Sequence, residues 1–212
     1  AGNPPPRTAE TPSGMLNSIG LTNPGLEGFI AEKLPQLSEL PTARIVSIAG
    51  TSNEEFAEMA KALCDHGGFD AIELNISSPN MKDGGMLFGC REDAARDVTR
   101  AVKDVSNLPV IVKLTPNVTD IVAIASSVEA GDADGIALIN TLLGMAIDAE
   151  TARPVLGNIT GGLSGPAVKP VGLALTWKVA AAVSVPIVGM GGISNATDAI
   201  EFMIAGASAI QV

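Results

Sequence analysis

The sequence is poor in the side chains that most enzymes use to move protons. Its 212 residues include one histidine, His66, and no tyrosine. A zinc site built from several histidines is therefore excluded, and a Ser–His–Asp triad would have to use His66. His66 precedes Gly67 and Gly68 at the end of a predicted helix, where a cation suits the last carbonyls. Proton transfer is left to Cys, Lys, Ser, Thr and carboxylates.

Basic residues and cysteines are also scarce. Lys and Arg number 13 against 23 Asp and Glu, for a net charge of −10, so a nucleic-acid partner is not expected. Cys64 and Cys90 form no CxxC pair, which favours a reducing compartment, and the cytoplasm is the expected location. The most apolar run, residues 136–147, is shorter than the roughly 20 residues of a membrane-spanning helix. No membrane association is expected.

Short apolar runs alternate with segments of helical period, and 46% hydrophobic content fits a single globular domain over residues 1–212. We expect parallel strands at residues 44–49, 71–77, 110–115, 135–141, 187–190 and 209–212. We expect helices at residues 53–66, 92–105, 120–130, 166–183 and 196–205, with Thr119 and Ser194 as N-caps. The Pro-rich segment 1–25 is expected to hold few strands.

Polar and glycine-rich clusters follow nearly every predicted strand: AGTS, NISSPN, LTPN, NTLLG and GMGG. Active-site residues of a (β/α)8 TIM barrel come from several strand ends at once, whereas an open doubly wound sheet concentrates them at one switch point. Neither GxGxxG after a first strand nor GxxxxGK[ST] is present. We therefore predict an α/β barrel with about six of its eight strands in this chain. Two strands would precede Ala1, so we expect the chain to be a piece of a longer barrel.

The segment LNISSPN places Asn75, Ser78 and Asn80 at the end of a predicted strand. Carboxamides both donate and accept hydrogen bonds, so they suit a flat ring that carries amide groups. The alternative is an Asx turn closed by Pro79. Both interpretations stay open at this point.

A second asparagine, Asn140, stands with Thr141 at the end of another apolar run. A buried asparagine is costly unless its amide is hydrogen-bonded, which favours a binding role for this pair. Asn17, in the opening segment MLNSIGL, could reach over the same mouth of the barrel.

Lys113 interrupts the strand run VIVKLTP. A lysine is rarely buried without a partner, so its ammonium either extends to the rim or points at a negative charge, with a Schiff-base role as a further option. The segments TGGLSGP and GMGGIS precede helices, and GMGG would follow the seventh strand of the barrel. Such loops bind phosphate in many barrels, although glycine also serves ordinary tight turns.

Several strings together resemble one family. They are ETPSGMLNSIGLTNPG, LNISSPN, PVIVKLTPNVTDI, LINTLLGMAID, GGLSGPAVKP, PIVGMGGI and AGASAIQV, and they span nearly the whole chain in order. The sequence is similar to the dihydroorotate dehydrogenases, which are FMN-dependent oxidoreductases of pyrimidine biosynthesis with a (β/α)8 barrel. INTLLGMAID and GGLSGPAVKP resemble the NAD-linked class, whose catalytic subunit works with an electron-transfer subunit that carries FAD and a 2Fe–2S cluster.

The resemblance implies a role for each matching residue. Ser78 would be the catalytic base, and Lys113 would stand beside the flavin ring and stabilise its anionic reduced form. The substrate, dihydroorotate, or the product, orotate, would be bound by Asn17, Ser18, Ile19, Gly20, Leu21, Asn75, Asn80, Asn140 and Thr141. FMN would contact Ser47, Asn75, Lys113, Ile139, Gly165, Gly191 and Gly192. No metal ion is implied.

Two positions depart from the pattern of the NAD-linked class. The base is normally Cys but is Ser78 here, and an asparagine that contacts the flavin is replaced by Ser47. The resemblance further implies a homodimer within a heterotetramer and NAD as the final electron acceptor. Two alternatives remain, a related flavin barrel that acts on another dihydropyrimidine and a barrel that only binds its ligand.

Overall fold

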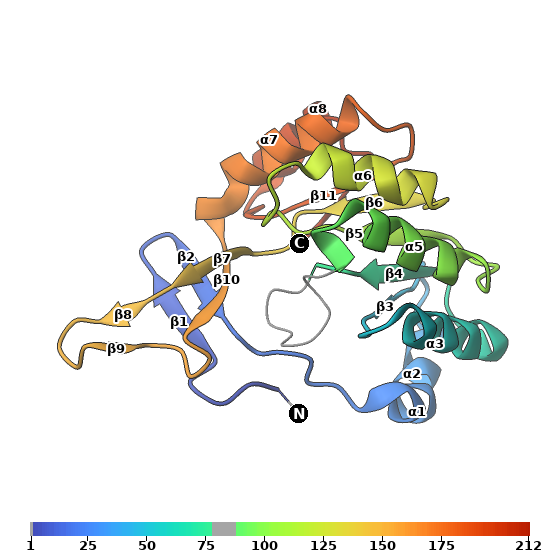
Figure 1. Ribbon diagram of the computed structural model, residues 1–212, viewed down its shortest axis with the longest axis horizontal. Helices are drawn as coiled ribbons and strands as arrows, with labels where there is room; N and C mark the ends of the chain where they lie inside the picture. Colours follow the sequence, from blue (N-terminus) through green and yellow to red (C-terminus); the bar gives the residue numbers. More distant parts are fainter. Residues whose placement is uncertain (1, 78–87) are drawn as a thin grey trace.

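The computed structural model describes residues 2–77 and 88–212, and its centre is a six-stranded parallel sheet (Figure 1). The strands are β3 (Ile45–Ile48), β4 (Ala71–Asn75), β5 (Val110–Lys113), β6 (Gly135–Leu138), β11 (Ile187–Met190) and β12 (Ala209–Gln211). Their order, β12-β11-β6-β5-β4-β3, follows the chain without reversal. A doubly wound sheet reverses its order at a switch point, so this sheet is part of a (β/α)8 barrel, as predicted.

In the described part of the chain, five helices of nine or more residues cover one face of this sheet (Figure 1). They are α3 (Asn53–His66), α5 (Glu92–Lys103), α6 (Ile121–Ala130), α7 (Lys169–Ala180) and α8 (Ala196–Ile204). All five were expected. The helix predicted over residues 166–183 is shorter, because a separate 3-10 turn, η2 (Pro166–Val168), precedes α7.

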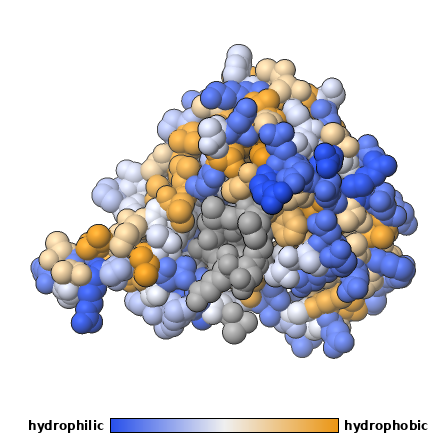
Figure 2. All heavy atoms as spheres, in the orientation of Figure 1, coloured by the Kyte–Doolittle hydropathy of each residue, from blue (hydrophilic) through white to orange (hydrophobic). Residues whose placement is uncertain are grey.

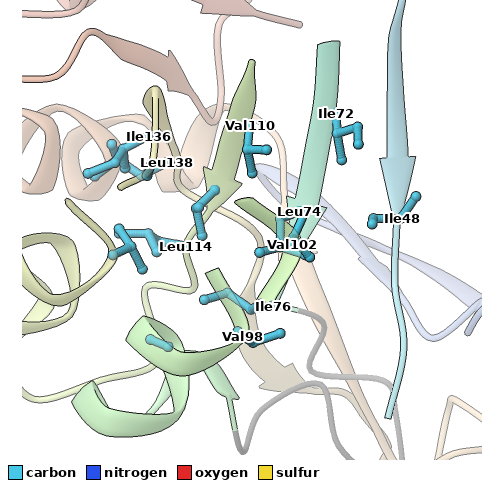
Figure 3. Packing of buried hydrophobic residues seen from close by; sticks show 14 of the residues in the cluster. Ile48, Ile72, Leu74, Ile76, Val98, Val102, Val110, Leu114, Ile136 and Leu138 are labelled. Carbon is cyan, nitrogen blue, oxygen red and sulfur yellow. The ribbon is translucent and has the colours of Figure 1, made fainter. Parts of the chain in front are cut away.

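The core lies between the sheet and these helices. Ile72, Leu74 and Val110 from the strands are fully buried, as are Val98 and Val102 from α5 (Figure 3). The alternate residues of the same strands point to the concave face of the sheet, because successive side chains of a strand face opposite ways. This alternation directs polar side chains of β3, β4 and β5 into the interior of the barrel.

A second, antiparallel sheet projects from the barrel (Figure 1). Its strands are β1 (Thr8–Thr11), β2 (Gly14–Asn17), β10 (Thr160–Ser164) and β7 (Leu142–Met145), in the order β1-β2-β10-β7, and the two-stranded pair β8 (Ile147–Asp148) and β9 (Arg153–Pro154) extends it. Exposed apolar side chains of Leu143, Met145 and Ile147 lie on this projection, and Figure 2 shows hydrophobic surface there.

This sheet corrects three expectations. The opening segment holds a hairpin, and the TGGLS segment is a strand. The strand predicted over residues 135–141 ends at Leu138 as β6, and the separate strand β7 follows it from Leu142. Glycine is depleted in strands, and β10 contains two. A Cβ on Gly161 would lie 2.6 Å from the Asn17 carbonyl oxygen, and one on Gly162 would strike Thr141. The glycines therefore permit a close approach that sequence propensity does not detect.

A short helical segment that follows β2 and precedes β3 in the chain was also not predicted. It consists of α1 (Gly25–Gly28), the π-helical turn η1 (Phe29–Lys33) and α2 (Leu34–Ser38). Leu34 is 1% exposed and anchors the segment in the core. Among the helices of residues 2–77 and 88–212, none has the length and apolar character needed to cross a bilayer.

The N-caps of α6 and α8 lie one residue later than expected. The Asp120 side chain accepts hydrogen bonds from the backbone nitrogens of Val122 and Ala123, at 2.9 and 3.2 Å. Asn195 likewise caps α8. The predicted caps Thr119 and Ser194 are therefore wrong. Each stands directly before a second residue with a side-chain acceptor, and only the residue next to the first helical turn can reach its free N–H groups.

Because Asp120 and not Thr119 caps α6, substitutions at these two neighbouring positions should have unequal effects on the free energy of unfolding. Asp120→Ala removes both capping bonds and should lower the free energy of unfolding by about 1 kcal/mol. Thr119→Ala removes an exposed side chain without a capping bond and should change it by less than about 0.5 kcal/mol. Urea denaturation of both variants measures the difference, and a larger loss in Thr119→Ala would contradict the assignment.

Candidate active site

A cavity of about 340 Å³ opens where β5, β6 and β11 end. The carboxyl ends of parallel strands carry the active sites of barrel enzymes, so this is the expected place for a functional site. Seven residues that the sequence analysis chose from separate segments line it together: Lys113, Ile139, Asn140, Thr141, Gly165, Gly191 and Gly192.

The glycines form one wall of the cavity. Gly165, Gly191 and Gly192 have φ values of 98°, 115° and 72°, a region in which glycine is the least strained residue. A Cβ on Gly192 would lie 2.7 Å from the Gly165 carbonyl oxygen and 2.8 Å from the Lys169 nitrogen. The two glycine-rich segments therefore touch each other at the start of α7. Close backbone and a helix N-terminus together suit an anionic group such as a phosphate.

An ion-pair cluster behind this wall ties α7 to α8. The Lys169 Nζ lies 2.6 Å from Asp198 Oδ1 and 2.8 Å from Glu201 Oε2. The other oxygen of Asp198 accepts hydrogen bonds from the Ser194 backbone and the Asn195 side chain. The hydrogen bond from Lys169 lowers the pKa of Asp198, and the same bond raises the pKa of Lys169. Sequence reasoning missed this cluster, since its members come from two different helices.

Lys113 points into the barrel beside a carboxylate. Its Nζ lies 3.6 Å from Glu73 Oε1, and the Ser47 hydroxyl donates to that same oxygen at 2.9 Å. The side chains of Lys113 and Glu73 are only 18% and 10% exposed. Glu73 is thus the partner that a largely buried lysine requires. The sequence IELN contained a signal for Glu73, because polar residues alternate with apolar ones there. Glu73 therefore lies on the same face of β4 as Asn75, which was already a candidate.

Ser47 lies on the concave face but outside the 340 Å³ cavity. It lines a second cavity, of about 270 Å³, with Glu73, Ile111 and Ala137. The Ser47 hydroxyl is linked to the first cavity by its hydrogen bond to Glu73, which forms an ion pair with Lys113 of that cavity.

Asn75 and Asn140 are joined by a serine that the sequence analysis did not select. The Ser77 hydroxyl donates to Asn75 Oδ1 at 2.8 Å and accepts from Asn140 Nδ2 at 2.8 Å. The Ser77 backbone nitrogen also donates to Asn75 Oδ1, at 3.2 Å, which forms an Asx-type turn. Pro79, which was expected to close such a turn, lies outside the described residues, as do Ser78 and Asn80 of the alternative binding set.

Asn117 holds the segment that carries Thr141. Its Nδ2 donates to the carbonyl oxygen of Thr141 and to the Thr115 hydroxyl, both at 3.0 Å, and its Oδ1 accepts from the Leu143 backbone at 2.9 Å. Asn117 was also missed, although the cluster LTPN contains it. A polar residue after a strand was the available signal, but its partners are distant in sequence.

The segment Asn17 to Leu21 lies next to the site without lining the 340 Å³ cavity. Asn17 ends β2 and pairs with Gly162, whose Cα approaches the side chain of Thr141. Ser18 is fully buried, so its hydroxyl faces the protein interior. Ile19 and Leu21 are exposed, and Gly20 between them has a φ of 76°.

Two predicted residues, Ser78 and Asn80, lie outside the described residues. Among the residues that are described, no group of three or more potential ligands of the His, Cys, Asp and Glu types could hold a metal ion.

Comparison with known proteins identifies close relatives. A family model described as dihydroorotate dehydrogenase matches residues 1–212. A "Dihydroorotate dehydrogenase B (NAD(+)), catalytic subunit" from Geobacillus kaustophilus is 56% identical over 211 residues, covering 100% of this chain and 67% of that protein. A protein of the same description from Citrifermentans bemidjiense is 55% identical over 212 residues, or 70% of its length.

One solved structure shares the fold at low sequence identity. The crystal structure of the Amycolatopsis orientalis BexX/CysO complex contains a chain that superposes with a TM-score of 0.54 at 17% identity. The match covers 84% of this chain and 62% of that one. At this identity the likeness supports the fold alone.

The ion-pair cluster predicts a distinct response to acid. Because the pKa of Asp198 is lowered in the folded state, its contribution to stability is present above the pKa of the unfolded chain, near 4, and is lost as the pH falls through the lower folded value. Asp198→Asn should therefore destabilise the protein at pH 7 and flatten the decline in melting temperature between pH 5 and pH 3.

Asp65→Asn is the matched control, since Asp65 belongs to an exposed ion pair with Lys61 on α3. It should leave the acid dependence of the melting temperature unchanged. Parallel acid curves for Asp198→Asn and the unmodified protein would rule out the assigned role of the cluster.

Proposed function

The chain belongs to the dihydroorotate dehydrogenase family of oxidoreductases, and on this premise we propose that it oxidises (S)-dihydroorotate to orotate with bound FMN, in pyrimidine biosynthesis. The observation that carries the proposal is the single cavity in which Lys113, the Asn140–Thr141 pair and the two glycine segments meet. A cation, amide groups and an anion cradle in one cavity suit a phosphorylated cofactor next to a polar ring.

The residues present fit FMN. A Cβ on Gly165 or Gly192 would lie 2.7 Å from backbone atoms, and Gly191 has a φ of 115°. This cradle lies at the start of α7, so its backbone can approach the FMN phosphate. Lys113, held by Glu73, would place its positive charge beside the ring. When bound, FMN supplies the acceptor for the hydride that leaves C6 of dihydroorotate.

Residues of the chain itself would bind the substrate and transfer the proton. Asn75, Asn140 and Thr141 would bind the dihydropyrimidine ring and keep it fixed over the cavity. The Ser78 hydroxyl oxygen would take the proton from C5 of the substrate. A serine is a weak base because its pKa lies far above neutrality, so it needs local activation.

The proposal extends to partners. The relatives are described as NAD(+)-linked catalytic subunits, which supports an electron-transfer subunit that carries FAD and a 2Fe–2S cluster, with NAD as the final acceptor. We also propose that this chain forms a homodimer within a heterotetramer that contains the electron-transfer subunit. Cys64 and Cys90 are free thiols, which supports the reducing cytoplasm as the location.

The FMN-loaded protein should bleach when dihydroorotate is added without oxygen. Lys113→Met should slow this bleaching by about 100-fold, since it removes a preorganised charge beside the cofactor. Lys178→Met is the control, because Lys178 is exposed on α7, and it should bleach at the original rate. Stopped-flow absorbance measures both. Faster bleaching by dihydrouracil than by dihydroorotate would instead favour another dihydropyrimidine as the substrate.

Variants of Ser78 test the assigned base. Ser78→Ala should lower kcat by about 10²–10⁴-fold while orotate still binds. Ser78→Cys should remain active, with a rate that rises as the pH increases toward the thiol pKa of about 8.5, because only the thiolate can take the proton. Steady-state rates between pH 6 and pH 10 provide the measurement. Orotate binding without turnover in all three proteins would favour a barrel that only binds its ligand.

A further inference from the structure

We propose that Ser77 is a positioning residue that sets the hydrogen-bonding polarity of the substrate site. Its hydroxyl orients the Asn75 and Asn140 amides so that Asn75 presents donors to the ligand. The inference rests on the proposed function, because it takes dihydroorotate or orotate as that ligand. Ser77 itself is fully buried and would act only through the two asparagines.

A backbone N–H can only donate, so the side-chain atom of each asparagine that lies nearest to one is identified as the amide oxygen. The Ser77 nitrogen lies 3.2 Å from one side-chain atom of Asn75, so that atom is the oxygen, Oδ1. The Thr141 nitrogen lies 2.7 Å from Asn140, so the atom there is again Oδ1. Both assignments hold before any ligand is considered.

The hydroxyl of Ser77 links the two amides in one direction. It has a single hydrogen, and its neighbours are Asn75 Oδ1 and Asn140 Nδ2, each at 2.8 Å. It therefore donates to Asn75 and accepts from Asn140, since the reverse would set a lone pair against a lone pair. Because Ser77 is 0% exposed, bulk water cannot take over these bonds.

The network decides what remains for a ligand. Both acceptor positions of Asn75 Oδ1 are used by Ser77, so Asn75 can offer the two hydrogens of Nδ2. Asn140 keeps one hydrogen on Nδ2 and one acceptor position on Oδ1. Three donors and one acceptor complement orotate, whose two ring carbonyls and carboxylate are all acceptors.

Ser77→Ala tests this role, because it removes the hydroxyl and keeps the backbone turn. Two hydrogen bonds are lost, and Asn75 retains only the longer bond to the Ser77 nitrogen. We expect the Kd for orotate and the KM for dihydroorotate to rise about 10-fold, with kcat within about threefold of the original value, because the loss falls on uniform binding. Ser78→Ala, at the neighbouring serine, should give the opposite pattern, with a lower kcat and a preserved Kd.

Two further variants separate positioning from a general packing effect. Ser77→Cys nearly preserves the volume but hydrogen-bonds weakly, so its Kd should lie between those of the unmodified protein and Ser77→Ala. Thr176→Val removes another fully buried hydroxyl, one without a hydrogen-bond partner in the described structure, and should leave orotate binding unchanged. Isothermal titration of the FMN-loaded proteins with orotate, with melting temperatures in parallel, gives both readouts.

The outcomes distinguish this inference from the proposed function. An unmodified FMN-loaded protein that does not bind orotate would overturn the proposed function. If the unmodified protein binds orotate and a folded Ser77→Ala or Ser77→Cys binds it equally well, the role of Ser77 is overturned. A 10-fold weakening in Thr176→Val would overturn it too, because loss of any buried hydroxyl would then suffice.

Discussion

The parallel pairing of six strands in unbroken chain order is the constraint on which the site depends. Because neighbouring strands run the same way, every carboxyl end lies at one rim of the sheet. Asn75, Lys113, Ile139 and Gly191 each stand at or just beyond such an end, so segments far apart in sequence share one mouth. The second sheet adds to this rim, since β7 begins directly after Thr141 and β10 leads into Gly165.

Four parts of the candidate site are each held by a neighbour with no expected part in the chemistry. Glu73 holds Lys113, Ser77 holds the two asparagines, and Asn117 holds the Thr141 segment. Asp198 holds the glycine cradle through Lys169. A site must be rigid to bind a ring in one orientation, and buried polar networks provide that rigidity only when every member is hydrogen-bonded. The four supporting residues therefore contribute to ligand binding by keeping the residues they contact in a fixed orientation.

The sequence was sufficient for the barrel strands and for many residues at the rim, because both follow from local patterns. The helix Asn53–His66 and the strand Ile187–Met190 were predicted residue for residue. The antiparallel sheet was not, because its pairing joins β2 to β10 across most of the chain and its glycines oppose strand propensity. The supporting partners were missed for a related reason. Glu73, Ser77, Asn117 and Asp198 are ordinary polar residues in sequence, and only their contacts in space give them a role.

The charge of the protein bears on how an anionic ligand could be held. With a net charge of −10, the surface as a whole repels both a phosphate and a carboxylate. That repulsion is screened beyond about 8 Å at physiological salt, so binding depends on short-range groups inside the cavity. The structure supplies them as Lys113, as the backbone at the start of α7 and as the amide of Asn140, to which Ser77 joins the amide of Asn75. Since most of these donors are neutral, the site can attract an anion without leaving an unpaired positive charge in its empty state. Binding therefore depends on how the amides are oriented, because a neutral amide favours an anion only when its N–H groups face that anion. For this reason, a single hydroxyl that orients two amides matters to the site.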